Sequence, residues 1–185
     1  MKKVESARGV TVSFRLVEEA DAEFIVRLRT DPELGRYLFP TDPSVQKQRE
    51  WLADYKKREA DGVEYYYIIF RNEDEKRCGT VRLFIEEDHF EWGSLILNGD
   101  KTPTSSIEMA LFICQAGFEV FGFQKASCKV HKDNLPSIKF HAKMNARIVG
   151  EVETGVGMER LYEMNLEDWE KLRQKFKPLL VKELN

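Results

Sequence analysis

The sequence has few cysteines, no long apolar run and no excess of charge of one sign. Its cysteines, Cys78, Cys114 and Cys128, are odd in number, widely spaced and set in apolar segments without CxxC spacing. This pattern excludes a disulfide framework and predicts reduced, buried thiols. Nucleophilic catalysis is also disfavoured, because each cysteine is expected inside a strand or helix with no adjacent base.

Charge is balanced, with 29 basic and 32 acidic residues mixed along the chain. Since there is neither a basic block nor an acidic tail, no nucleic-acid partner is expected. The histidines, His89, His131 and His141, lack the paired spacing of metal ligands, so no metal site is expected. No apolar segment follows the first two lysines. We therefore expect a cytoplasmic protein with neither a secretion signal nor a membrane span.

What the sequence does contain is a globular composition, 42% hydrophobic and 33% charged over 185 residues, which suits one domain. No repeat, low-complexity tract or linker divides it. We therefore expect residues 1–185 to form a single domain, with a core at about 10–165 and a C-terminal helix at about 166–178.

Hydrophobic periodicity predicts strands alternating with helices. The expected strands are 10–17, 64–70, 78–85, 89–97, 125–131, 147–153 and 159–165, and the expected helices begin near 18, 43, 106, 135 and 166. The order β-α-α-β-β-β-α-β-α-β-β-α predicts an α/β (α+β) fold. In it, helices flank a mixed, mostly antiparallel central sheet of about seven strands.

A polar loop precedes the helix expected at 106–121, which is apolar on nearly every side. A helix N-terminus exposes unpaired N–H groups and a partial positive charge, so it can bind an anion. Side-chain donors near this start are Lys101, Thr102, Thr104, Ser105 and Ser106. A second interpretation stays open, in which Ser105 and Glu108 form a capping box without any ligand.

The next helix start carries Asn134, Ser137 and His141 at i, i+3 and i+7, which places them on one stripe. Asn134 can bond an amide of a ligand, and His141 can exchange a proton near neutral pH. A capped surface helix with a half-buried histidine is the alternative. Two adjacent helix starts of this kind, at the carboxyl ends of two strands, would together hold one long anionic ligand bearing amides.

Three segments resemble the GNAT superfamily of acyl-CoA-dependent N-acyltransferases, over roughly Val12 to Glu163. "FRLVEEADAEFIVRLRTDPEL" is similar to the opening of the branch that contains ribosomal-protein N-terminal acetyltransferases. "EWGSLIL" stands where the family has "EIGYWL", and "NLPSIKFHAKMNARIVGE" resembles its "NxxSIxxYEKLGFxxxG" ending. The last segment is the most specific of the three.

The resemblance implies acetyl-CoA as co-substrate. Backbone groups of the strand around Leu95, Ile96 and Leu97 would pair with pantetheine, and amides of the following loop would bind the pyrophosphate. Asn134 matches the pantetheine-contacting Asn of the family, with Ser137 beside it. His141 stands where the family often has a Tyr that protonates the leaving thiolate.

Two departures from the family pattern stand out. The glycine-rich loop (Q/RxxGxG/A) is replaced by "GDKTPTSS", and "MNA" replaces "LGF" after the last helix of the motif. Because backbone N–H groups do most of the phosphate binding, Ser and Thr can serve in this loop, but weaker cofactor binding, or none, is the alternative. Similar loop replacements occur in family members that acetylate amino groups of sugar nucleotides.

Acetyl transfer needs a deprotonated amine, a polarised thioester and a proton for the sulfur. We expect N–H groups near Leu95 and Ile96 to polarise the thioester and His141 to supply the proton. Glu91 is the first candidate for the base and Asp88 the second, and both are equally well explained as exposed strand-end charges.

The acceptor amine is expected at the loop 35–40 and on the strand 64–70, where Arg36, Tyr37 and Tyr66 are the candidate contacts. Arg15 and Arg29 are further candidates with less support. Two of the three consecutive tyrosines 65–67 are expected in the core.

The sequence thus predicts an acetyltransferase acting on a primary amine of a small molecule, possibly an amino sugar nucleotide, as a monomer or homodimer. Acetylation of a protein N-terminus or an antibiotic amine is the second hypothesis. A non-catalytic acyl-CoA-binding module is the third.

Overall fold

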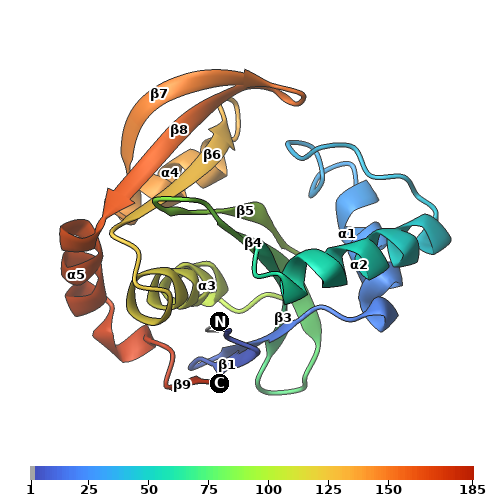
Figure 1. The fold of residues 1–185 in the computed structure, drawn as a ribbon, viewed down its shortest axis with the longest axis horizontal. Helices are drawn as coiled ribbons and strands as arrows, with labels where there is room; N and C mark the ends of the chain where they lie inside the picture. Colours follow the sequence, from blue (N-terminus) through green and yellow to red (C-terminus); the bar gives the residue numbers. More distant parts are fainter. Residues whose placement is uncertain (1–2) are drawn as a thin grey trace.

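The computed structural model describes residues 3–185, which form one twisted sheet with helices on both faces (Figure 1). Its nine described strands follow the order β7-β8-β6-β5-β4-β3-β2-β1-β9. The strands are β1 (Ser6–Arg8), β2 (Val12–Leu16), β3 (Glu64–Arg71), β4 (Arg77–Ile85), β5 (Phe90–Leu97), β6 (Lys125–His131), β7 (Arg147–Thr154), β8 (Gly157–Asn165) and β9 (Glu183–Leu184).

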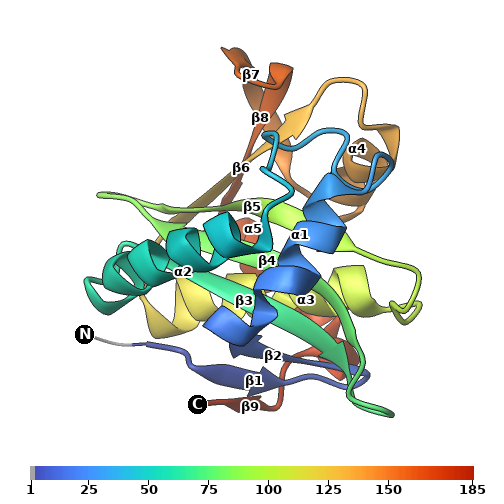
Figure 2. The same ribbon diagram turned by 90° about the vertical axis from the view of Figure 1, so that its right-hand side faces the viewer.

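Helices cover the two faces of the sheet. They are α1 (Ala22–Thr30), α2 (Val45–Ala60), α3 (Ser105–Cys114), α4 (Leu135–Lys143) and α5 (Leu166–Lys175), with short helical turns η1 (Glu19–Asp21), η2 (Gln115–Val120) and η3 (Lys177–Leu179). Helices α1 and α2 pack on one face, called the front face, with Tyr66 and Ile68 in their core. Helices α3, α4 and α5 pack on the back face (Figure 2).

The predicted mixed, mostly antiparallel sheet is confirmed, and all seven expected strands form. The predicted number of strands is too low, because β1 and β9 add two strands at one edge. Strand β1 has three residues and β9 two, so neither shows a periodicity that a sequence pattern can detect.

The helix expected at 106–121 begins at Ser105 and continues from Cys114 into the π-helical turn η2. The alternative capping box is wrong, because the N-cap is Thr104 and the Glu108 N–H bonds the Thr104 carbonyl. Glu108 is fully buried, and its carboxylate bonds the turn between β1 and β2 as well as the hydroxyl of Thr104, not the backbone N–H of Ser105. The expected burial of this helix is confirmed.

Strands β5 and β6 are the only parallel neighbours among the described strands, and they pair at two positions, Phe90 with Ala126 and Glu91 with Ser127. Beyond Glu91 the two strands separate. The register between β4 and β5 shifts here, and Ser94 adopts a positive φ of 51° at the irregularity. A bulge of this kind turns the strand and leaves its edge without a ladder partner.

The prediction of buried, reduced thiols is confirmed for all three cysteines, which are free and buried. Burial raises the pKa of Cys78 to about 11 and that of Cys114 to about 12. These thiols therefore stay protonated at neutral pH. Over residues 3–185, no helix combines the length and hydropathy that a membrane crossing requires.

Candidate functional site

A cavity of about 390 Å³ lies where β5 and β6 separate, and it is called here the β5–β6 cavity. It extends from the start of α4 on the back face to the α1–α2 loop (residues 31–44) and the tip of the β7–β8 hairpin. Six residues singled out in the sequence line it: Tyr37, Glu91, Leu95, Asn134, Ser137 and His141. The fold thus brings the strand end and the helix start together, as expected.

Asn134 is the N-cap of α4, and its Oδ1 accepts a hydrogen bond from the Ser137 N–H at 3.2 Å. This bond explains the local geometry, because an N-cap side chain satisfies one of the unpaired amides of the first turn. The Asn134 side-chain NH₂ has no hydrogen-bond partner in the described part of the chain and lines the cavity. It is therefore available to a carbonyl group of a ligand.

His141 lies at the back of the cavity, 3% exposed. Its ring lies between those of Trp92 and Tyr162, with centroids 5.2 and 4.9 Å away, and Nδ1 is 3.5 Å from the Cys128 sulfur. Burial lowers the pKa of His141 to about 4. The imidazole is therefore neutral at pH 7. From the sequence, His141 was expected either to exchange a proton near neutral pH or to be half-buried, whereas the structure shows a buried ring with a lowered pKa.

The hydroxyl groups before α3 are bonded within the protein. Thr104 Oγ1 donates to Glu108 Oε1 at 2.7 Å, and Thr102 N–H donates to Ser105 Oγ at 2.8 Å. Thr11 in the β1–β2 turn bonds Thr102, Thr104 and Glu108. The side-chain donors expected here therefore serve mainly to hold the loop in place.

At the start of α3, backbone N–H groups remain free to bind a ligand. The N–H groups of Ser106 and Ile107 have no acceptor among residues 3–185, as is usual for the first turn of a helix. Lys101 is exposed beside them. An anion at this helix start would be bound by these amides and the Lys101 ammonium group.

Several ionisable groups lie on the front face of the sheet at the mouth of the β5–β6 cavity. Glu91 pairs with Lys129 at 2.5 Å. Glu159 on β8 lies opposite His131 in the ladder, is 8% exposed, and accepts a hydrogen bond from Thr154 Oγ1 at 2.8 Å. No lysine or arginine of the described chain pairs with Glu159. It is the carboxylate in this cavity without a cationic partner.

Asp88, the second candidate base, lies outside the β5–β6 cavity at the exposed turn between β4 and β5. Hydrogen bonds from His89 and Lys125 hold the pKa of Asp88 below its ordinary value. It is a surface ion pair, and the structure places it away from the other candidates.

The α1–α2 loop covers one side of the β5–β6 cavity. Tyr37 donates its hydroxyl to the Asp133 carbonyl at 3.0 Å and stacks on His131, with centroids 4.8 Å apart. Phe39 contacts the hairpin tip, where a Cβ on Gly155 would lie 2.6 Å from the Phe39 ring. Tyr37 therefore holds the α1–α2 loop in place. Arg36 is exposed and lines neither this cavity nor the one described next.

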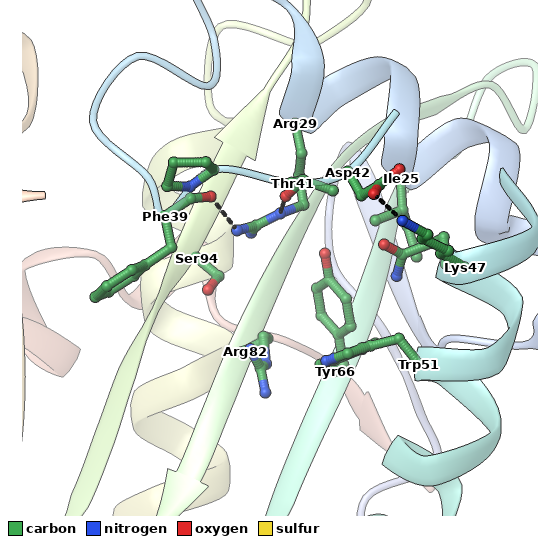
Figure 3. A pocket seen from close by; sticks show the side chains of 12 residues that line it. Ile25, Arg29, Phe39, Thr41, Asp42, Lys47, Trp51, Tyr66, Arg82 and Ser94 are labelled. Carbon is green, nitrogen blue, oxygen red and sulfur yellow. Dashed lines mark hydrogen bonds and ion pairs between the residues drawn. The ribbon is translucent and has the colours of Figure 1, made fainter. Parts of the chain in front are cut away.

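A second cavity of about 430 Å³, called the α1–α2 cavity, adjoins the first and shares Phe39, Arg82 and Ser94 with it (Figure 3). Tyr66, predicted as an acceptor contact, lines this cavity. Tyr65 and Tyr67 point to the back-face core, as expected for two of the three tyrosines. Ile96 and Leu97 line neither cavity, and the Ile96 side chain packs in the front-face core.

Sequence reasoning missed Gln48, Arg82 and Glu159. Arg29, Gln48 and Arg82 lie on two helices and a strand, and only the tertiary structure brings them together. Arg29 was only a weak candidate from the sequence, because it is one of two basic residues in the last turn of α1 and nothing local distinguishes it from Arg27.

Comparisons with known proteins agree with this geometry. The acetyltransferase (GNAT) domain family matches residues 11–147. No curated protein sequence matches the chain. Apo FdhC, described as a nucleotide-linked sugar GNAT, is 34% identical, with a TM-score of 0.83 and coverage of 97% of this chain and 99% of its own.

Two further solved structures share the fold at lower identity. The ribosomal-protein-S5-alanine acetyltransferase from Vibrio fischeri is 14% identical, with a TM-score of 0.71 over 89% of this chain and 98% of its own. A mutant spermidine N-acetyltransferase from Vibrio cholerae is 14% identical, with a TM-score of 0.69 over 86% of this chain and 96% of its own.

Proposed function

Because the chain belongs to the GNAT acetyltransferase family, we propose that it transfers an acetyl group from acetyl-CoA to a primary amine of a nucleotide-linked amino sugar. The observation that carries the proposal is the separation of β5 and β6 after Glu91, which opens the β5–β6 cavity beside the start of α4. The similarity to a nucleotide-linked sugar GNAT supports the choice of acceptor.

Acetyl-CoA would approach this cavity from the back face. The amides of Ser106 and Ile107, with Lys101, would bind its diphosphate. The Asn134 amide and the unpaired edge of β5 near Leu95 would bond the pantetheine arm. This arrangement would leave the thioester between the separated strands, with its carbonyl accessible from the front face.

The acceptor amine would then attack from the front face. A C–N bond forms, the C–S bond breaks, and the amine loses a proton to a carboxylate. Glu159 suits this role better than Glu91, because the Glu91 carboxylate is already bonded to the Lys129 ammonium group. Glu91 would instead position Lys129 beside the opening.

His141 lies on the side of the cavity where the sulfur would leave. Since the ring is neutral at pH 7, it would act as a hydrogen-bond donor to the thiolate, or pass a proton from water, and not as a standing imidazolium. Trp92 and Tyr162 hold the ring in orientation.

The charge of the α1–α2 cavity favours an anionic acceptor over a polyamine. Arg29, Lys47 and Arg82 line it, against a single carboxylate, Asp42. A polycation such as spermidine would meet like charges there, and repulsion of this kind lowers affinity. A diphosphate-linked sugar would meet cations.

A thiol-release assay with acetyl-CoA and a panel of amines tests the proposal. The panel holds nucleotide-linked amino sugars, peptides with free N-termini, aminoglycosides and spermidine. We expect the highest kcat/KM with a nucleotide-linked amino sugar. A higher kcat/KM with a peptide or an aminoglycoside would favour the second function instead.

A non-catalytic acyl-CoA-binding module remains a second candidate, because the loop before α3 lacks the family glycines and bonds its own hydroxyls. Retained binding of acetyl-CoA without acetylation of any amine in the panel would support it.

A further inference from the structure

The α1–α2 cavity contains one cation that no acid neutralises. Lys47 pairs with Asp42 at 2.5 Å, and Arg82 shares Glu64, a buried residue of β3, with Arg58. Arg29 makes no ion pair with any carboxylate in the part of the chain that the structure describes. Among the cations that line the cavity, Arg29 is therefore the one without a carboxylate partner in the described chain.

The Arg29 guanidinium group is held in one orientation by two residues of the α1–α2 loop. Nε donates to Thr41 Oγ1 at 2.6 Å, and Nη2 donates to the Phe39 carbonyl at 3.1 Å. Nη1 has no acceptor among residues 3–185. Figure 3 shows this group reaching into the cavity from the helix side, while the Tyr66 hydroxyl points into the same space from the sheet.

Gln48 supplies a second donor to this cavity. It lines the α1–α2 cavity, and its side-chain amide makes no hydrogen bond within residues 3–185. Although the residue is only 8% exposed, its amide is not among the buried, unsatisfied polar groups of the described chain, so it reaches the open space of the cavity. The amide can therefore donate to a ligand without giving up a hydrogen bond within the protein.

We propose that Arg29 and Gln48 form an anion subsite that binds the phosphate groups of the acceptor. This inference rests on the proposed function and assigns one part of the acceptor to one part of the cavity. The free Nη1 of Arg29 and the Gln48 amide supply convergent donors to phosphate oxygens, and a guanidinium group suits phosphate geometry.

The subsite also explains how the amine is delivered. Phe39, Arg82 and Ser94 form the boundary between the two cavities, so a ligand anchored by phosphate under Arg29 extends toward that boundary. The exposed ring of Phe39, 57% accessible, offers an apolar surface for the sugar. The sugar amine then reaches the β5–β6 cavity, where the thioester would lie.

A matched set of acceptors tests the subsite. One amino sugar is assayed free, as its 1-phosphate and as its nucleotide diphosphate derivative, with wild type, R29Q and R29K. We expect R29Q to raise KM for both phosphorylated acceptors by about tenfold or more. KM for the free amino sugar and for acetyl-CoA should change less than about twofold, and R29K should restore part of the loss.

The control is R27Q, which removes the same charge from the same helix. Arg27 is exposed and does not line the α1–α2 cavity, so its kinetics should match wild type. A wild-type enzyme that shows no preference for phosphorylated acceptors overturns the subsite. An equal loss with free and phosphorylated acceptors also overturns it, since Arg29 would then act only through Phe39 and Thr41.

Direct binding separates failure of the subsite from failure of the proposed function. Coenzyme A is added at saturation so that the proposed diphosphate site at the start of α3 is occupied. Calorimetric titration with inorganic pyrophosphate should then show binding to wild type and R27Q, and at least tenfold weaker binding to R29Q and to Gln48→Leu. Pyrophosphate binding without acetylation of any amine would contradict the proposed function alone. Acetylation of nucleotide-linked amines without pyrophosphate binding, or with equal pyrophosphate binding by R29Q, would contradict the subsite alone.

Discussion

His141 shows how strongly a residue's surroundings decide its chemistry. Two aromatic rings and the Cys128 sulfur enclose the imidazole and exclude water from it. The charged form loses its hydration there, so the neutral form is favoured. Sequence spacing placed His141 on the correct stripe of α4 beside Asn134 and Ser137, but spacing carries no information about enclosure.

The depressed pKa of His141 predicts a pH-dependent stability. Between pH 6.5 and about 4 the unfolded chain binds a proton at this residue and the folded chain does not. The contribution is therefore complete above pH 6.5 and is lost as pH falls, by on the order of 3 kcal/mol at pH 4. Urea unfolding of wild type and H141F at several pH values measures it.

Other groups also titrate in that range, but they are common to wild type and H141F. The difference in slope between the two proteins therefore isolates His141. Parallel dependences on pH would mean that the histidine is hydrated in the folded protein.

Glu159 leads to a prediction about the base. We expect E159Q to lower kcat about 10²-fold and to leave KM for acetyl-CoA unchanged, because the amine would lose its proton acceptor. The isosteric variant keeps the Thr154 hydrogen bond geometry. Single-turnover and steady-state kinetics at several pH values measure the effect.

E91Q is the matched control, since Glu91 lies in the same cavity and is partly exposed. Its loss should stay within about tenfold. If E91Q proves the more damaging variant, the base is Glu91, as the sequence first indicated.

At the scale of elements, the loop before α3 is held by one buried carboxylate. Glu108 accepts hydrogen bonds from the N–H groups of Val10 and Thr11 and from the hydroxyls of Thr11 and Thr104. This network replaces the conformational role of glycines by tying the loop to the β1–β2 turn. The sequence alone suggested a local capping box, because Thr11, which Glu108 bonds, lies about 97 residues away from it along the chain.

E108Q should therefore loosen this loop. Loss of the charged acceptor should destabilise the protein by about 1.5–3 kcal/mol in urea unfolding. KM for acetyl-CoA should rise while KM for the acceptor amine stays close to wild type, because the α1–α2 cavity lies on the other face. A change confined to KM for the acceptor would show that the Glu108 hydrogen bonds do not help the loop before α3 to bind acetyl-CoA.

At the scale of the whole molecule, the α1–α2 loop and the β7–β8 hairpin close over the sheet from opposite sides (Figure 1). The two cavities meet beneath them. A long cofactor entering from the back face and an acceptor entering from the front would thus meet at Ser94 and Arg82.

Acetyl-CoA binding is the prediction at this scale. Calorimetric titration should release or absorb heat, and ligand at 100 times Kd should raise the free energy of unfolding by about 2.7 kcal/mol. Pantetheine, which lacks the diphosphate, should bind at least about tenfold more weakly. Absence of any heat with acetyl-CoA would favour the interaction module over the enzyme.

The sequence by itself determined the order of elements and the polar stripe of α4. These follow from periodicity and capping, which act over a few residues. Tertiary structure alone decided the edge strands β1 and β9, the burial of His141, and the partners of Glu108 and Glu159. It also built the α1–α2 cavity from Arg29, Gln48 and Tyr66. Contacts between residues far apart in sequence depend on how helices and sheet pack, and no local pattern encodes that packing.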